Sequence, residues 1–445
     1  MVPCIEFSPQ ILSTAIFTLV ILLIVARRVE ESLAGLLGIA LILILGLTDL
    51  YTAFSSYVDW NIISILLGMW IISYLLNDSG ATKYITYKLI SRTRNVFGVL
   101  FLLNLLAGIV TMFVDNVLVV LLFVPIMISV SKLFNIDVVK SSIVIALSAN
   151  FMGSALLLGD LPPQLLHVIF GAEFMDFIWM SNRPSAFPIL LVSFILTIVI
   201  TLRILFKHRG AGAERDLANV FFEDLRNLDK RYMILSITAL IIVIILMALR
   251  KPLSSIAGYE IRLGVFPLLV ASITSLIAVY MRKTSFERVV EEGIDLNAIL
   301  FYISLFILVG SLESTGVLDI LAESVTPYLI NLATAYIIIY WLSAPIVAFV
   351  EHDAYILIML KTFKHLTDSG VLRDPWPLNW ALLFSGTLGS NYTAAGAPAL
   401  YVAFRLIEKD IKRRISPREI YSTTIPYATI SLVICFLVSY FIWVR

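Results

Sequence analysis

Residues 153–164 read GSALLLGDLPPQ, and they interrupt an otherwise apolar stretch of the chain. Glycine weakens a helix, and proline removes a backbone donor and clashes with the preceding turn. Two glycines and two prolines so close together therefore predict that a helix unwinds here. Unwinding leaves unpaired backbone groups beside the carboxylate of Asp160. Half-helix ends of this kind can coordinate ions in a membrane interior.

The composition predicts that the chain lies in a membrane. Hydrophobic residues make up 60% of its 445 residues and charged residues 14%, whereas an ordinary soluble domain has about a quarter charged residues. Apolar runs of about 20 residues, the length that crosses a bilayer core as a helix, recur along the sequence. The runs typical of simple helices are residues 11–26, 33–47, 61–76, 188–205, 232–249, 263–280, 297–312 and 425–444. We therefore expect an all-α, multi-pass protein of the plasma membrane, embedded in the lipid bilayer.

Four further apolar stretches are interrupted at what would be mid-membrane depth. Residues 96–131 and 333–365 are each interpreted as a re-entrant helical hairpin, with Asp115 or Glu351 at the tip. Residues 141–175 and 379–408 contain breaks rich in glycine or proline and are predicted to be broken transmembrane helices. Irregular backbone and carboxylates at this depth are tolerated only inside protein or beside a water-filled cavity. The tips and breaks are therefore the candidate binding segments.

A self-comparison predicts that the second half of the chain repeats the first. Asp59-Trp60-Asn61 recurs as Asp295-Leu296-Asn297, and residues 113–115 meet residues 349–351 at the same offset along the chain. Gly159 meets Gly396 when that offset is lengthened by a single position. Weak internal similarity of this kind is typical of transporters that arose by duplication. We predict two repeats, residues 1–206 and 232–445, joined by a basic cytoplasmic linker at residues 207–231.

The distribution of basic residues predicts that the two repeats have opposite orientations, because Lys and Arg in short loops favour the cytoplasmic side. Residues 83–94, after the first copy of the shared helix, contain four of them, and residues 314–331, after the second copy, contain none. Near the repeat ends the asymmetry reverses, with one in residues 170–185 and six in residues 405–418. We expect inverted repeats with the N-terminus outside. Against this pattern, a predicted outside loop contains Arg250, Lys251 and Arg262.

The polar residues and close-packing glycines at the two tips and two breaks form the candidate site. They are Asp115, Asn116, Asn150, Ser154, Gly159, Asp160, Glu351, His352, Asp353, Asn391, Thr393 and Gly396. A bound Na+ is the one cofactor considered, held by Asp115, Ser154 and Asn391, and no other cofactor is expected.

Several of these residues also have plainer interpretations. Asp115 could cap a buried helix, and Asp160 beside glycine and proline could form a turn. His352 and Asp353 could lie in a polar outer loop if the second hairpin is shallow. The sequence alone leaves these alternatives open beside the binding role.

Charge in the four segments favours a cation as the transported ion. The tips and breaks contain four carboxylates, those of Asp115, Asp160, Glu351 and Asp353, while residues 96–130, 141–182, 333–360 and 380–404 contain no Lys or Arg. A charge in the membrane interior costs several kcal/mol unless it is compensated, so such a site suits a cation or protons. We hypothesise antiport of an inorganic cation, best Na+, against protons. Because helix N-termini bind anions without basic side chains, arsenite, other oxyanions and carboxylates remain alternatives.

At these motifs the chain resembles the ion transporter superfamily, in the branch of arsenical pump membrane proteins (ArsB) and NhaD-type sodium/proton antiporters. The resemblance lies in Phe113-Val114-Asp115-Asn116 with Pro125, in the Asn150 to Pro163 break, and in residues 311–318 and 389–393. It implies inverted repeats, an ion held between two tips and two breaks, alternating access and a homodimer. The chain departs from that branch at Leu161, at Gln164 and at Glu351-His352-Asp353.

Other classes of function receive less support. Because the chain has no Gly-rich Lys-Ser/Thr motif, an ATPase would have to be a separate protein. An intramembrane hydrolase could use Asp115 and Asp160 as a dyad, but it would not require a repeated second half. A channel or receptor would show no proton-coupled counterflow. We expect no enzyme activity and no nucleic-acid partner.

Overall fold

The computed structural model describes residues 8–25, 29–90, 93, 95–206, 228–329 and 331–445. These residues form an assembly of helices with one short ribbon, in which β1 (Trp179–Met180) pairs antiparallel with β2 (Arg183–Pro184). Arg92, Arg94 and residues 207–227 of the predicted linker lie outside the described residues. α12 begins at Lys230, so the last two residues of the predicted linker belong to a helix.

Among the described residues, six helices are long and apolar enough to cross a membrane. They are α4 (Trp60–Asp78), α7 (Asn116–Phe134), α10 (Ala186–Leu205), α12 (Lys230–Ala248), α16 (Leu296–Ser314) and α22 (Pro417–Trp443). Shorter apolar helices include α1 (Pro9–Val25), α2 (Glu31–Ile44) and α14 (Val265–Tyr280). Each stretch predicted as a simple helix is helical over most of its described residues, and the all-α fold class is confirmed.

The two predicted hairpins and two predicted broken helices have the expected form. The first hairpin is α6 (Val96–Thr111) followed by α7, and the second is α18 (Leu332–Val347) followed by α19 (His352–Asp368). The first broken helix is α8 (Val138–Gly153) and α9 (Leu161–Phe170). The second is α20 (Trp376–Ser390) and α21 (Pro398–Ile411). Each break contains one glycine, Gly159 or Gly396, and the prolines lie in the first turn of the helix that follows.

Short elements complete the chain between these helices. In the first half they are α3 (Leu50–Thr52), a π-helix (Ala53–Tyr57), α5 (Ala81–Ile90) and a 3₁₀-helix (Phe174–Phe177). In the second half they are α13 (Arg250–Ala257), α15 (Phe286–Gly293), α17 (Val317–Val325) and a 3₁₀-helix (Thr326–Tyr328).

Helix starts repeat with the same spacing as the sequence motifs. Asp59 caps α4 by accepting from two backbone N–H groups, and Asp295, its equivalent in the second half, caps α16 in the same way through Ala298 N. Asn95 and Asn331, which are related by the same offset, cap α6 and α18. An N-cap side chain satisfies backbone donors that a helix start leaves unpaired, so it fixes where the helix begins. The repeated caps therefore explain why the two halves divide into helices at equivalent residues.

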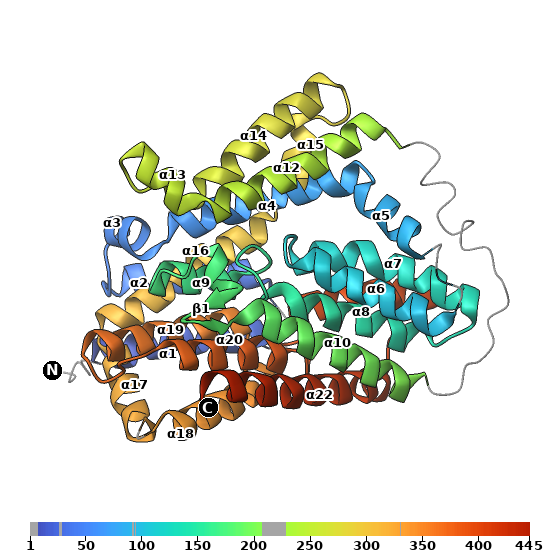
Figure 1. The fold of residues 1–445 in the computed structure, drawn as a ribbon. Helices are drawn as coiled ribbons and strands as arrows, with labels where there is room; N and C mark the ends of the chain where they lie inside the picture. Colours follow the sequence, from blue (N-terminus) through green and yellow to red (C-terminus); the bar gives the residue numbers. More distant parts are fainter. Residues whose placement is uncertain (1–7, 26–28, 91–92, 94, 207–227, 330) are drawn as a thin grey trace.

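The broken helices lie at the centre of the packing. Nearly every residue of α8 and α20 is buried, and α8 packs against α6, α7, α21 and α22 while α20 packs against α18, α19 and α22. Figure 1 shows a separate layer formed by α12, α13, α14 and α15, which lies along α4. The helix order of the first half recurs in the second, and the opposite orientation of the two halves stays a prediction.

Candidate functional site

Each hairpin tip presents a carboxylate that caps the returning helix. Asp115 Oδ1 accepts from Val117 N at 2.9 Å and from Leu118 N at 3.3 Å, at the start of α7. Glu351 Oε2 accepts from Ala354 N at 3.0 Å, at the start of α19. Capping uses one oxygen of each carboxylate, and the plainer role proposed for Asp115 is therefore present.

Each break is held against a tip by a glycine that allows close backbone approach. A Cβ atom on Gly159 would overlap the carbonyl oxygens of Gly153 and Thr111, the latter at the end of α6. A Cβ atom on Gly396 would overlap the carbonyl oxygen of Val347, at the end of α18. Because backbone cannot rotate away as a side chain can, both positions require glycine. Both predicted glycines therefore place a break beside the tip of its own half.

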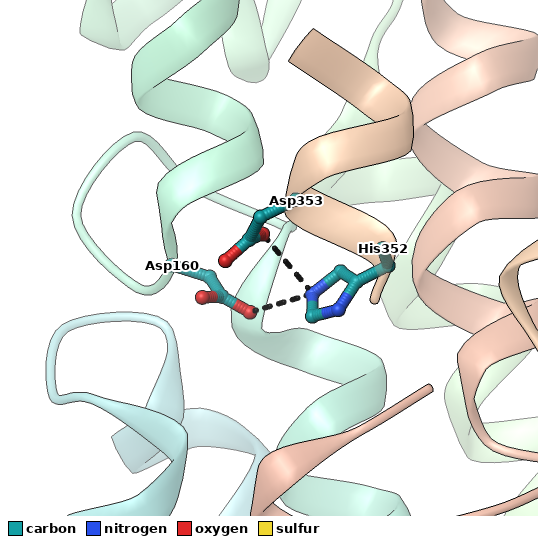
Figure 2. A group of neighbouring side chains, drawn as sticks. All are labelled: Asp160, His352 and Asp353. Atoms are coloured by element: carbon teal, nitrogen blue, oxygen red, sulfur yellow. Dashed lines mark ion pairs between the residues drawn. The ribbon is translucent and has the colours of Figure 1, made fainter. Parts of the chain in front are cut away.

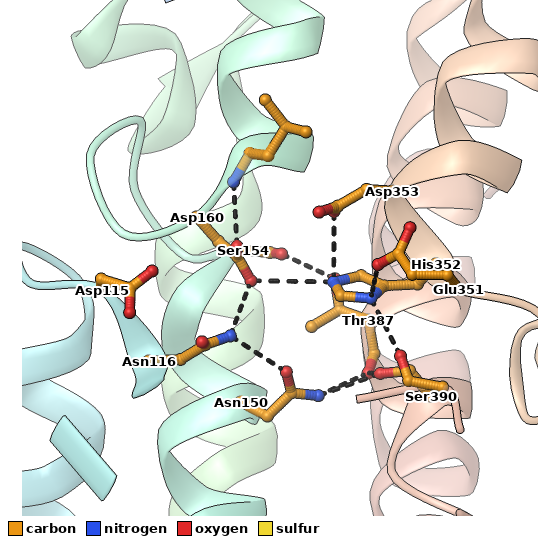
Figure 3. Close-up of polar contacts among 12 residues, drawn as sticks. Asp115, Asn116, Asn150, Ser154, Asp160, Glu351, His352, Asp353, Thr387 and Ser390 are labelled. Atoms are coloured by element: carbon orange, nitrogen blue, oxygen red, sulfur yellow. Dashed lines mark hydrogen bonds and ion pairs between the residues drawn. The ribbon is translucent and has the colours of Figure 1, made fainter. Parts of the chain in front are cut away.

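Acidic side chains from the first break and the second tip meet around one histidine (Figure 3). His352 Nε2 lies 3.3 Å from Asp353 Oδ1 and 3.8 Å from Asp160 Oδ2. On the other side of the ring, His352 Nδ1 lies 3.1 Å from Glu351 Oε1 and 3.0 Å from the carbonyl oxygen of Gly396. Residual exposure is 2% for His352, 3% for Asp353 and 8% for Asp160. The alternative that His352 and Asp353 lie in a polar outer loop is therefore wrong.

An amide and hydroxyl network links this acidic cluster to the second break. Asn116 Nδ2 donates to Asp160 Oδ2 at 3.1 Å and to Asn150 Oδ1 at 3.3 Å. Asn150 Nδ2 in turn donates to Ser390 Oγ at 3.0 Å and to Asn391 Oδ1 at 3.1 Å. These hydrogen bonds connect the first tip to both breaks. The acidic cluster around His352 connects the second tip to the first break. All four predicted segments thus contribute to one buried site (Figure 3).

The structure brings together most, but not all, of the predicted site residues. Asp115 is less buried than its neighbours, and its bonds to backbone N–H groups stay within its own helix start; Figure 3 places it to one side of Asn116 and Asp160. The Thr393 hydroxyl donates to the carbonyl of Ala348 and accepts from Ala395 N, so it serves the backbone of the break. Hydrogen bonds between described residues do not join Asp115 to Ser154 and Asn391, and the Na+ site at those three residues stays a prediction.

Two members of the site were missed by sequence reasoning. Thr387 Oγ1 shares a 2.6 Å hydrogen bond with Ser154 Oγ, and Ser390 accepts from Asn150. Both lie in the last turns of α20, just before the second break. The offset that relates Gly159 to Gly396 also places Thr387 opposite Asn150 and Ser390 opposite Gly153. Applying that offset to every residue of the break would have found them.

The balance of charge makes the site suited to a cation. Asp160, Glu351 and Asp353 surround a single histidine, and Asp115 lies beside them. Residues 96–130, 141–182, 333–360 and 380–404, which include the tips and breaks, contain no Lys or Arg. The lysines further along α7 and α19 form ion pairs with other residues: Lys132 with Asp410, Lys361 with Glu313 and Lys364 with Asp368. A cation bound here would compensate carboxylates that the membrane interior otherwise disfavours.

A buried polar site built from two hairpins and two broken helices defines the class as a multi-pass secondary transporter. The sequence matches the CitMHS family, described as citrate transporters, over residues 21–385, and the chain belongs to this family. Its relatives are transporters, so it is not an enzyme, and the broader superfamily resemblance is confirmed. The specific ArsB and NhaD branch stays a prediction.

Similar proteins agree with this class. The chain is 26% identical to "Uncharacterized transporter Rv2684" of Mycobacterium tuberculosis over 447 residues, covering 98% of each. It is 24% identical to the P protein of Mus musculus, covering 88% of this chain and 55% of that protein. Among solved structures, Neisseria gonorrhoeae MtrF has a TM-score of 0.59 at 14% identity, covering 99% of this chain and 96% of that one. The Alcanivorax borkumensis YdaH transporter has a TM-score of 0.58 at 12% identity, covering 97% and 98%. These two structures support the fold alone.

Proposed function

We propose that the chain exchanges a cation for protons across the membrane, using the site between the two tips and two breaks. The observation that supports the proposal is the convergence of Asp160, Glu351 and Asp353 on His352, with no Lys or Arg in residues 141–182 or 333–360. Unpaired carboxylates inside a membrane are costly and mark ion or proton pathways. Either a cation or protons can neutralise them, which gives the two states of an exchange cycle.

The arrangement of the helices supports alternating access to this site. Residues from both halves form it, and the broken helices that contribute them are packed against both hairpins. Outside the site, α4 packs against α14, and α2 packs against α16. Many transporters work by rocking one bundle against another around a site near the membrane centre. We infer that the two halves, in opposite orientations, open the site to each side in turn. A homodimer and an outside N-terminus belong to the same proposal.

A second candidate function takes account of the family description, citrate transporter. A free tricarboxylate would meet several carboxylates and no basic side chain, and like charges at short range repel. It would fit only if a cation entered with it and the Asn150, Ser390 and Asn391 side chains bound its polar groups. Transport of a carboxylate together with a cation is therefore the alternative, and arsenite, which is neutral when protonated, is a further one.

Proteoliposomes with a trapped pH-sensitive dye test these candidates. Purified protein is challenged with Na+, Li+, Mn2+, arsenite, and citrate with and without a divalent cation. We expect a cation gradient alone to drive proton movement. Asp115→Asn and Glu351→Gln should each abolish it, while Asp319→Asn, at an exposed ion pair with His365, should not. Unchanged flux in both variants, or proton movement only with citrate, would contradict cation exchange.

A further inference from the structure

We propose that Asp160, His352 and Asp353 form a binding site for a divalent first-row transition-metal cation, which makes such a metal the cargo of the proposed exchange. The inference rests on the proposed function because it names the substrate class of the same site. One ligand atom from each of the three side chains lies within 4.8 Å of the other two, and all three residues are buried. Figure 2 shows the two carboxylates facing the same nitrogen of His352.

The orientation of the imidazole supports metal binding. Its Nδ1 contacts the carbonyl oxygen of Gly396 at 3.0 Å. A carbonyl can only accept a hydrogen bond, so Nδ1 carries a hydrogen and, in the neutral ring, Nε2 presents its lone pair to the carboxylates. The carboxylate of Glu351 lies 3.1 Å from the same Nδ1. Metal-binding histidines characteristically donate their second nitrogen to a carbonyl or carboxylate, which fixes the tautomer and the ring plane.

Two buried atoms in the cluster have no hydrogen-bond partner. His352 Nε2 and Asp353 Oδ1 are 3.3 Å apart, yet neither makes a hydrogen bond with the other or with any described residue. Buried polar atoms are rarely left unpaired. Two ligands of a tetrahedral Zn2+, each about 2.0–2.2 Å from the metal, are themselves about 3.3 Å apart without one pointing at the other. The separation and the lack of alignment fit two atoms that flank a common ion.

The ligand types select the kind of metal. Na+, Mg2+ and Ca2+ prefer oxygen ligands, whereas an imidazole nitrogen suits Zn2+ and neighbouring transition metals. Three protein ligands leave a fourth position for water, as in sites that exchange a ligand rather than in closed structural sites. Asn116 Nδ2 orients Asp160 by donating a 3.1 Å hydrogen bond to Oδ2, the oxygen that faces His352. The cluster therefore has both direct ligands and groups that orient them.

Metal binding to the full-length protein in detergent tests the inference, with Mn2+ and Zn2+ as probes after removal of metal by a chelator. Titration calorimetry should find one ion per chain. His352→Ala and Asp353→Asn should each weaken binding by more than the roughly 10–100-fold lost when an orienting group is removed. His365→Ala is the matched control, because His365 lies on the same helix, faces Asp319 at 3.3 Å and is about half exposed. Its binding should equal that of the wild type.

A third variant keeps the inference testable if His352→Ala fails to fold. His352→Cys should retain binding but shift its preference from Mn2+ towards Cd2+, a change that a purely structural histidine would not cause. Wild-type protein that binds neither Mn2+ nor Zn2+ but still exchanges another cation for protons would overturn the metal site and leave the proposed function standing. Metal binding without any cation-driven proton movement would support the site and contradict the proposed function.

Discussion

The two halves share a sequence of helices but differ in the residues at their tips and breaks. The first tip presents Asp115-Asn116, and the second presents Glu351-His352-Asp353. The first break contains Asp160, and the equivalent position of the second break is Ala397. The charged groups therefore gather where the first break meets the second tip, while amides and hydroxyls occupy the rest of the site. The repeated backbone therefore provides the framework, and the residues that differ between the two halves in four short segments form its one acidic centre.

Asp160→Ala makes the first break resemble the second and should have the largest effect. The substitution removes the acceptor for Leu161 N and for Asn116 Nδ2 as well as a carboxylate of the acidic centre. Hydrogen bonds to charged groups contribute about 1.5–3 kcal/mol each. We expect cation-driven proton flux in proteoliposomes to fall by at least about 100-fold, since about 1.4 kcal/mol corresponds to tenfold. Near-normal flux would show that the acidic difference between the halves is not functional.

Two acidic residues near the C-terminal ends of the broken helices give the next largest contrast. Glu173 and Asp410 occupy equivalent positions in the two halves, but Glu173 pairs with Arg250 with both side chains 10% exposed, whereas Asp410 pairs with Lys132, which is 56% exposed. Removing one partner of a buried pair costs about 3–5 kcal/mol. Because Arg250 keeps its contact with Glu260 at 3.2 Å, we expect Glu173→Gln to cost less, about 2–3 kcal/mol.

Asp410→Asn is the matched variant and should cost no more than about 1 kcal/mol, as exposed pairs do. Thermal unfolding of both variants in detergent measures the difference between their losses of stability. Added NaCl should reduce this difference only slightly, because the Glu173 pair is buried and therefore weakly screened. Equal shifts in midpoint temperature would mean that the two pairs are not distinguished by burial.

The pairing of Arg250 illustrates what sequence reasoning could not reach. In the sequence, Arg250 was a basic residue in a predicted outside loop and ran against the topology. In the structure it is buried between Glu173 and Glu260, so its charge is compensated by residues that include a distant part of the chain. Loop-charge rules count side chains along the chain and contain no information on such tertiary partners. The helices, hairpins and breaks were predictable because periodicity, caps and breakers act locally.

The candidate site was predictable in part for the same reason. Asp160, Glu351 and His352 stand out because ionisable residues are rare in apolar segments. Thr387 and Ser390 do not, since hydroxyl residues are common in membrane helices and bond to their own backbone. The carboxylates of Asp160 and Glu351 each use one oxygen for capping and turn the other towards His352. Which oxygen does which depends on how the neighbouring helix ends are placed relative to one another. Those details required the structure.

Gly159→Ala and Gly396→Ala test whether the two halves close their breaks in the same way. Each added Cβ would overlap carbonyl oxygens of the adjoining tip. Overpacking typically costs about 1–3 kcal/mol, and we expect both variants to lose stability within that range. Gly386→Ala is the control, because its Cβ would meet only the side chain of Ile356, which can rotate. If only one of the first two variants is destabilised in a thermal melt, the two breaks are not equivalent.

The smallest expected effect lies at the start of the second half, where α12 begins with a charged cap. Asp229 accepts from Arg231 N and Tyr232 N and pairs with Lys283, whereas α1, the first helix among the described residues, begins after Ser8. The Lys283 ammonium, followed by the backbone hydrogen bonds, lowers the pKa of Asp229 from its ordinary value of 3.8. A lowered pKa in the folded state stabilises the protein above pH 3.8, and this contribution is lost as the pH falls below it.

Asp229→Asn should therefore lower the melting temperature slightly at neutral pH and leave it equal to that of the wild type at the lowest pH at which the protein still folds reversibly. The shift is small because the pair is partly exposed, and exposed ion pairs contribute little. Thermal melts of both proteins at steps from neutral pH down to about pH 3 measure the difference. Only the wild type carries a titrating group at this cap. A melting-temperature difference between the two proteins that grew on acidification would therefore contradict the prediction. It would show that Asp229 is stabilised in its protonated form and that Lys283 is not its partner in solution.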